Sequence, residues 1–237
     1  MAARVTATAP TWRQRQAAET KKQIVRAARR LFVASGYAGT TVEQIAAEAG
    51  VAVATVYKAF GTKAAIARDL NDLIDEEAGT TSLAGRIEAE TDPARLIALT
   101  VARLRTQHER CGDIIAAIRS GAAVDATLAD VWAEGTRRYD DGIRKLTSKL
   151  RAEGALRPGI DQAQAAGLLS VLCSTEAFTD LTTRHGWTAS QWETWTGSAL
   201  RQLLLREPPA RGDTGPPTSD RTPIRSSSAQ RHQPAKR

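Results

Sequence analysis

Apolar residues near the start of the chain recur with the period of an α-helix. The positions follow the spacing i, i+3, i+4, i+7 and i+8, and they are Ile24, Ala27, Ala28, Leu31 and Phe32. This stripe predicts a helix from about Arg13 to Ser35 that ends at Gly36. Three basic side chains lie off the stripe and are expected to face outward, namely Arg26, Arg29 and Arg30.

Two short helical patterns follow, and a glycine separates them. Thr41 is placed as an N-cap, and Gln44 three positions later completes a capping box at the start of the first pattern. Gly50 ends this helix, and the second pattern covers residues 53–59. A further helix is expected to begin at Lys63.

The remaining positions repeat the same three- and four-residue spacing. Caps and glycines delimit further helices, expected over residues 92–110, 113–122, 125–153, 161–183 and from 188 to just before 208. No segment shows sustained two-residue alternation, so no sheet is expected. The pattern therefore predicts an all-α fold.

The two short helices have the spacing of a helix-turn-helix. Counted from Val42, Ala46 is fifth, Gly50 ninth and Val56 fifteenth. The fifth residue must be small where the helices cross, the ninth must tolerate a positive φ in the turn, and the fifteenth must be apolar between the helices. The second helix then presents its outward side chains to a DNA major groove. They are Ala52, Val53, Thr55, Tyr57 and Lys58.

Charge is distributed unevenly along the 237 residues. The net charge is +7 over residues 1–63, −4 over residues 64–205 and +4 over residues 206–237. A basic first quarter favours a polyanionic partner, although a solvated basic face would look the same.

Cys111 and Cys173 are the only cysteines and lack motif spacing, and the N-terminus has no apolar signal segment. No apolar run is long enough to cross a bilayer, so we expect a cytoplasmic protein.

Composition divides the chain into four segments. We expect a disordered N-terminus over residues 1–12, a DNA-binding domain over 13–62 and a larger helical regulatory and dimerisation domain over 63–206. Residues 207–237 are rich in Pro, Gly, Ser, Thr and Arg and are expected to form a disordered basic tail.

Other candidate sites are weak. His108 and Cys111 are spaced as two metal ligands, but a third is missing, and Cys173 has no nearby histidine. No nucleotide-binding glycine motif occurs, so we expect no metal, no cofactor and no catalytic residues. Glu176 lies in an apolar stretch and either lines a ligand cavity or satisfies an internal hydrogen bond, the second being favoured. Trp132, Tyr139 and Phe178 are candidate pocket residues, although core packing is the favoured explanation for each of them.

The segments IVRAARRLFVASGYAGTT and VEQIAAEAGVAVATVYKAFGTKAAI resemble the tetracycline-repressor (TetR) family of bacterial transcription regulators. The similarity runs from about Glu19 to Glu77. It implies an all-helical homodimer with an N-terminal DNA-binding domain and a C-terminal domain that dimerises and binds an inducer. By position, Tyr57 and Lys63 would contact phosphates, and Thr41 and Val42 would place the first short helix on the DNA backbone. Base contacts would come from Val53, Ala54, Thr55 and Lys58.

The resemblance also implies dimerisation through the last two helices, which packing within one chain would also explain. The expected interface consists of Gly167, Ser170 and Ser174 and, on the last helix, Trp192, Trp195, Ala199 and Leu203. The expected function is a repressor that an unknown small molecule releases from a palindromic operator. An activator or a ligand-independent regulator with the same head is the alternative. An enzyme localised by a DNA-binding head is a remote one.

Overall fold

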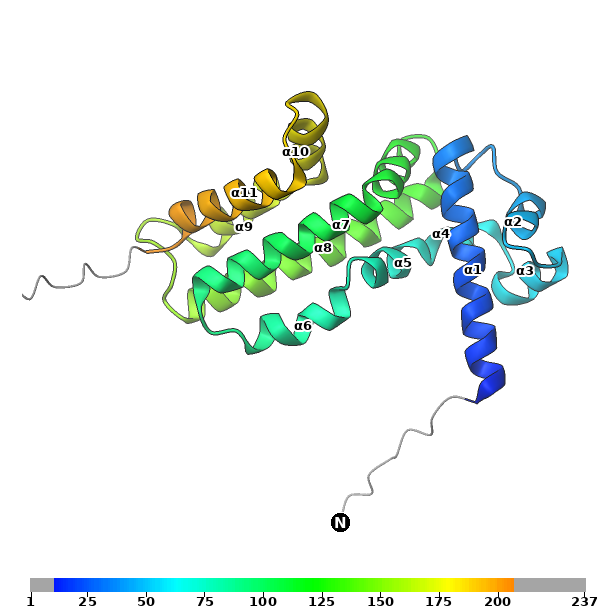
Figure 1. Cartoon of the computed structure of the whole chain (residues 1–237), viewed down its shortest axis with the longest axis horizontal. Coiled ribbons are helices and arrows are strands. Elements are labelled where there is room, and N and C mark those ends of the chain that lie inside the picture. Colours follow the sequence, from blue (N-terminus) through cyan, green and yellow to red (C-terminus); the bar gives the residue numbers. More distant parts are fainter. Residues whose placement is uncertain (1–10, 207–237) are drawn as a thin grey trace, which may run out of the picture. The chain divides into compact units, whose positions relative to one another are not determined.

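The protein is described here by a computed structural model that covers residues 11–206, except for the side chains of residues 81–84. Residues 1–12 and 207–237 were expected to be disordered. Residues 1–10 and 207–237 lie outside the described part, whereas Thr11 caps the first helix and Trp12 begins it. The described residues before Glu207 belong to one compact unit (Figure 1).

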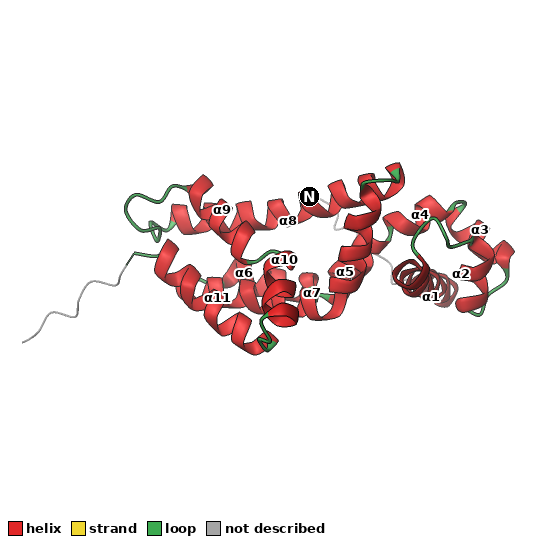
Figure 2. Ribbon diagram, turned by 90° about the horizontal axis from the view of Figure 1, so that it is seen from above, coloured by secondary structure: helices red, strands yellow, loops and turns green. Residues whose placement is uncertain are grey.

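This unit is built from helices, as the sequence predicted (Figures 1 and 2). They are α1 (Trp12–Ser35), α2 (Val42–Glu48), α3 (Val53–Phe60), α4 (Lys63–Arg68), α5 (Leu70–Glu77), α6 (Thr80–Ala89), α7 (Pro93–Ala122), α8 (Ala126–Ala152), α9 (Gln162–Leu172), α10 (Thr175–Thr179), the π-helix η1 (Asp180–Arg184) and α11 (Ala189–Leu204). Between residues 11 and 206 the only strand-like pairing is an isolated bridge between Leu156 and Leu205. None of the helices in this range has the length and apolar character needed to traverse a bilayer.

Local capping signals set the helix ends as expected. Thr41 and Gln44 form the capping box of α2, and Thr188 forms the corresponding box of α11. The Asp125 carboxylate accepts hydrogen bonds from the first turn of α8. Gly50 has φ 67°, a conformation that costs glycine little and other residues more.

Two helix boundaries predicted from the sequence are wrong. We expected separate helices on either side of Gly112, but α7 continues from Pro93 to Ala122. A glycine inside a helix costs about 1 kcal/mol, and the continuous helix buries Cys111, Ile114 and Ile118 to at most 3% exposure. Conversely, the helix expected over residues 161–183 breaks, because the Ser174 hydroxyl caps α10 by accepting from Ala177 N at 3.0 Å.

Two hydrophobic cores share α7 and α8. The first core joins α1–α5 to the C-terminal part of α7 and the start of α8, through Cys111, Ile114, Ile118, Leu128 and Val131. The second core joins the other ends of these two helices to α9, α10 and α11 around Trp192. The helix-turn-helix packs on α1 and α4, and these two helices in turn pack on α7 and α8 (Figure 1).

Candidate nucleic-acid interface and interior cavity

The outer face of α3 is the most prominent feature of the helix-turn-helix. Ala54, Tyr57 and Lys58 have the spacing i, i+3 and i+4, and all three are exposed, with Tyr57 at 49%. Val56 points the other way and is 1% exposed in the first core. A tyrosine and a lysine therefore lie on a solvent-facing stripe that the core does not need.

The turn before α3 holds this stripe in place. Ala46 is 1% exposed, and its carbonyl accepts a hydrogen bond from Val51 N at 3.0 Å. Val42 and Val53 are only partly exposed, because both pack against the first core. Val42, Val53 and the partly buried Thr55 therefore expose less surface for DNA contacts than the exposed residues of α3 that are expected to bind DNA.

Thr41 and Lys63 are committed to contacts within the protein. The Thr41 hydroxyl accepts from Gln44 N at 3.2 Å, which leaves its own O–H free to donate. Lys63 Nζ donates to the carbonyls of Tyr37 and Thr40, at 2.8 Å each, and lies 4.2 Å from the Tyr37 ring centroid. The expected phosphate contact of Lys63 would have to use its third N–H. Sequence reasoning missed this arrangement because the partners lie more than twenty residues earlier.

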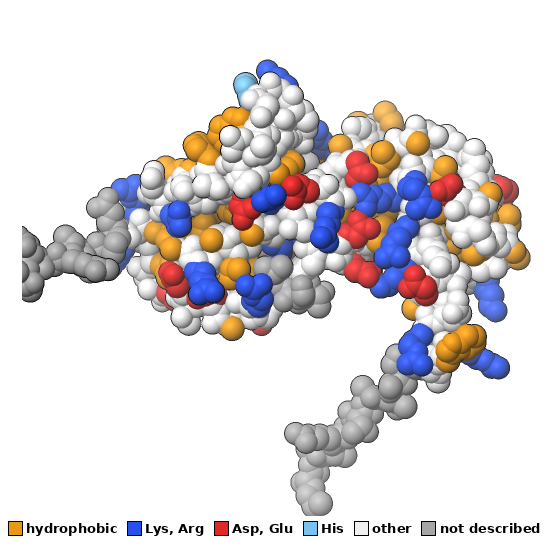
Figure 3. All heavy atoms as spheres, viewed as in Figure 1, with side chains coloured by type: hydrophobic (Ala, Val, Ile, Leu, Met, Phe, Trp, Pro, Cys, Tyr) orange, Lys and Arg blue, Asp and Glu red, His pale blue; other side chains and the backbone are white. Residues whose placement is uncertain are grey.

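Basic residues of α1 are largely paired with acids, where the sequence suggested an outward basic face. The expectation that Arg29 faces outward is wrong. Its guanidinium donates to Glu77, to Asp113 Oδ1 at 2.7 Å and to the carbonyl of Arg110. Lys22 pairs with Glu76, Arg26 with Glu19 and Arg30 with Glu48. Figure 3 shows Lys and Arg next to Asp and Glu on this part of the surface.

A cavity of about 900 Å³ lies between the two cores. Its walls include Ile74 and Ile118 from the first core and Leu96 and Leu146 from the second. The lining comes from α5, α6, α7, α8 and α10. A volume of this size is typical of ligand pockets, which span roughly 300–1,000 Å³.

Three of the four pocket residues suggested by the sequence line this cavity, namely Trp132, Tyr139 and Glu176. Phe178 is buried instead, with its ring 5.0 Å from His108 and 5.2 Å from Trp192. The internal hydrogen bond favoured for Glu176 is wrong. Its side chain is 51% exposed and pairs with Arg119.

His108 in the cavity wall and the two buried thiols near it are neutral at physiological pH. Burial lowers the pKa of His108 to about 4, because the imidazolium would lose its hydration. Its Nε2 lies 3.0 Å from the Cys173 carbonyl and its Nδ1 3.4 Å from the Thr175 hydroxyl. A proton on Nε2 satisfies both contacts. Burial also raises the pKa of Cys111 and of Cys173 to about 12, so neither thiol is a nucleophile at neutral pH. Within residues 11–206, no cluster of three His, Cys, Asp or Glu could hold a metal.

The expected dimer interface is only partly available. Trp192 is 0% exposed, which contradicts its placement on that face, and Ser174 caps α10. Along α11, one stripe is buried at Trp192, Thr196, Leu200 and Leu204. The neighbouring stripe leaves Trp195 48% and Leu203 39% exposed, with Ala199 partly exposed between them. On α9, Gly167 is exposed, Ser170 is partly buried, and Val171, which the sequence did not single out, is 67% exposed.

Comparison with known proteins finds relatives of the N-terminal part of the chain. Residues 24–70 match the sequence model of the bacterial regulatory proteins of the tetR family. The HTH-type transcriptional regulator TcmR of Streptomyces glaucescens is 41% identical over 73 residues, which make up 31% of this chain and 32% of TcmR. The chain therefore matches about a third of the length of such curated relatives.

Solved structures show that the similarity of fold extends beyond the N-terminal DNA-binding domain. FadR from Bacillus subtilis, in complex with stearoyl-CoA, aligns with a TM-score of 0.62 at 18% identity over 77% of this chain and 98% of its own. A protein from Saccharomonospora viridis, in complex with choline, aligns with a TM-score of 0.63 at 18% identity over 80% of this chain and 100% of its own. The motif, the curated relatives and the fold agree, and the DNA-binding segment of the chain, residues 24–70, matches the TetR family of bacterial transcriptional regulators.

Proposed function

We propose that this protein is a homodimeric repressor of transcription that binds a palindromic operator through α3 and is released by a small molecule bound in the cavity. The observation that carries the proposal is the exposed stripe of Ala54, Tyr57 and Lys58 on the second helix of a helix-turn-helix. A regulator of this kind acts on the bacterial chromosome, which places it in the cytoplasm.

The stripe offers complementary chemistry to the DNA major groove. Lys58 supplies a charge for a base edge or a phosphate, Tyr57 a hydroxyl for a phosphate, and the Ala54 methyl an apolar contact for thymine. Thr41 lies at the start of α2, where its free O–H and the helix N-terminus favour a backbone phosphate. Val42, Val53, Thr55 and the third N–H of Lys63 complete the proposed contacts.

Dimerisation would pair two such stripes. Val171, Trp195 and Leu203 are exposed apolar side chains on α9 and α11, which suits an interface between two copies. A two-fold axis would set the two copies of α3 about 34 Å apart, one turn of B-DNA, and would require a palindromic site.

Helix α7 offers a physical connection between the cavity and the DNA-binding head. One part of it contributes Thr100, Arg103 and Gln107 to the cavity wall. Further along, Asp113 and the carbonyl of Arg110 hold Arg29 of α1. A ligand that displaces α7 would therefore move α1 and change the separation of the two recognition helices. Since both must enter successive major grooves, a shift of a few Å weakens operator binding.

The alternative regulators share this head and differ in their response to ligand. An activator or a ligand-independent regulator would bind the same operator without release. Enzyme function has no support in the geometry, because the buried thiols of Cys111 and Cys173 are protonated and the histidine of the cavity wall is hydrogen-bonded on both nitrogens.

Selection of bound fragments from a random DNA pool tests the proposal. The purified native protein should enrich a palindrome, and the double variant Tyr57→Ala, Lys58→Ala should not. Arg144→Ala removes one exposed positive charge from α8 and serves as the control, which should enrich the same palindrome. Enrichment of nothing by the native protein at moderate salt, or equal enrichment by the double variant, would contradict the role of α3.

A further inference from the structure

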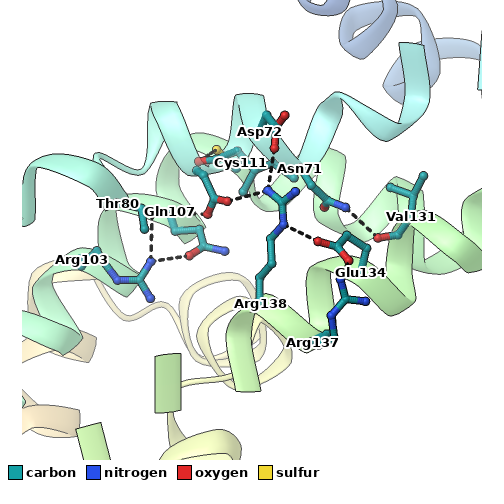
Figure 4. A network of polar contacts seen from close by, with 12 residues as sticks. Asn71, Asp72, Thr80, Arg103, Gln107, Cys111, Val131, Glu134, Arg137 and Arg138 are labelled. Atoms are coloured by element: carbon teal, nitrogen blue, oxygen red, sulfur yellow. Dashed lines mark hydrogen bonds and ion pairs between the residues drawn. The ribbon is translucent and has the colours of Figure 1, made fainter. Parts of the chain in front are cut away.

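Arg103 is a cation in the cavity wall that has no ion-pair partner among the described residues. It projects from α7 and is partly buried. One guanidinium nitrogen donates to Gln107 Oε1 at 3.1 Å and approaches Thr80 Oγ1 at 3.5 Å (Figure 4). Both of these partners are neutral. Over residues 11–206, no carboxylate lies within ion-pair distance of Arg103. Burial lowers the pKa of its guanidinium, because the charged form loses hydration in the wall.

Arg138, across the cavity on α8, is an arginine whose positive charge is compensated by nearby carboxylates. Its guanidinium pairs with Asp72 at 2.7 Å, with Asp75 at 2.8 Å and with Glu134 at 2.7 Å (Figure 4). Asp75 is a lining acid whose charge also acts on Arg103, and it is committed to Arg138. Arg103 therefore keeps N–H groups that no described residue occupies.

The carboxylates of the cavity do not favour a cationic ligand. Asp141 pairs with Arg144 and Glu176 with Arg119, while Asp140 and Glu88 are exposed to water. An exposed acid is solvated and screened, so it contributes little to binding. The desolvated charge of the wall is positive, and its neighbours are the neutral His108 and Gln107.

Apolar surface makes up most of the remaining wall. Leu96, Ile115, Ile118, Trp132 and Leu146 contribute to it, between the two cores. A cation left without an opposite charge in such surroundings costs free energy, and a carboxylate is the group that a guanidinium binds in two-point geometry.

We propose that the cavity binds a carboxylate-bearing amphipathic molecule, with the carboxylate on Arg103 and the apolar body between the two cores. The inference rests on the proposed function, since this molecule would be the ligand that regulates DNA binding. Gln107 and Thr80 position the guanidinium. The ligand oxygens accept from its remaining N–H groups.

Calorimetric titration of the purified full-length protein with three matched probes tests the charge preference. The probes are decanoate, decan-1-ol and decyltrimethylammonium, each below its critical micelle concentration. Decanoate should bind most tightly, and Arg103→Gln should weaken it roughly 10- to 100-fold, the range expected for a charged hydrogen bond. Arg184→Gln is an equal loss of charge whose partner Asp180 also lies outside the lining, and it should leave decanoate binding unchanged. Arg103→Lys keeps the charge without the two-point geometry and should fall between the native protein and Arg103→Gln.

The outcomes separate this inference from the proposed function. Equal binding of decanoate and decan-1-ol, preference for the cation, binding of none of the probes, or unchanged decanoate affinity in both Arg103 variants would overturn it. If Arg103→Gln does not fold, the decanoate affinity of Arg103→Lys is compared with that of the native protein instead. DNA selection is measured on separate samples. If the native protein enriches an operator but does not bind decanoate, only the proposed ligand class is refuted. If the native protein binds decanoate but enriches no DNA, only the proposed repressor function is refuted.

Discussion

Protonation of His108 should limit the stability of the protein at acidic pH. The imidazole is 6% exposed, and burial lowers its pKa from 6.5 to about 4. The unfolded chain therefore binds the proton more tightly than the folded protein between these values. By linkage, the stabilisation is complete above pH 6.5 and is lost as the pH falls towards 4.

The lowering of the His108 pKa determines how much the free energy of unfolding falls at acidic pH. A difference of about 2.5 pKa units corresponds to roughly 3 kcal/mol, of which about 2 kcal/mol is lost between pH 7 and pH 5. Arg103 adds to the penalty, because a second positive charge would form beside it. Thr175 and the Cys173 carbonyl are the remaining polar partners of the ring.

Urea denaturation at pH 7 and pH 5, followed by tryptophan fluorescence, measures this loss. In His108→Gln, an amide that does not titrate replaces the imidazole and retains a donor for the Cys173 carbonyl. The remaining titratable groups are the same in both proteins, so their contributions cancel in the comparison. The free energy of unfolding should fall by about 2 kcal/mol more in the native protein than in the variant. Equal losses would refute the assignment of a neutral buried imidazole.

Three other substitutions test the packing and the proposed assembly. Lys63→Ala removes the side-chain donor to the Thr40 carbonyl and one of the two donors to the Tyr37 carbonyl, and it should lower the free energy of unfolding by about 1–2 kcal/mol in chemical denaturation; unchanged stability would contradict the structural role of Lys63. Gly135→Ala places a Cβ 3.0 Å from Asn71 Oδ1, which is held by the bond from Asn71 to Val131, and should lower the thermal midpoint, whereas Gly142→Ala on the same helix meets nothing within 4 Å and should raise it. Val171→Ser with Trp195→Ser should convert the proposed dimer to monomer in analytical ultracentrifugation, and a retained dimer would place the interface elsewhere.

Local signals were sufficient for the helix-turn-helix. Thr41, Gln44 and Gly50 act on neighbouring residues, so their cap and turn could be predicted from spacing alone. The same holds for the apolar Val56, whose place in the core follows from the period of one short helix.

Contacts between distant segments were beyond the reach of such signals. Lys63 and Arg29 were expected on the surface, and each is drawn inward by partners on other elements. Trp192 and the exposed Trp195 are three residues apart on α11. Which of the two is buried depends on the packing of α7 against α11, and the sequence does not reveal it. Arg103 gave no sequence signal, because its importance lies in the pairing of the lining acid Asp75 with Arg138 of another helix, which leaves Arg103 with neutral hydrogen-bond partners.

The central claim is that α3 presents Ala54, Tyr57 and Lys58 to DNA in each half of a dimer. A crystal structure of the protein bound to its selected operator tests it most directly. The account predicts two copies of α3 in successive major grooves, with Tyr57 and Lys58 in contact with phosphates or base edges. A complex in which α3 faces solvent, or in which one copy alone binds, would contradict it.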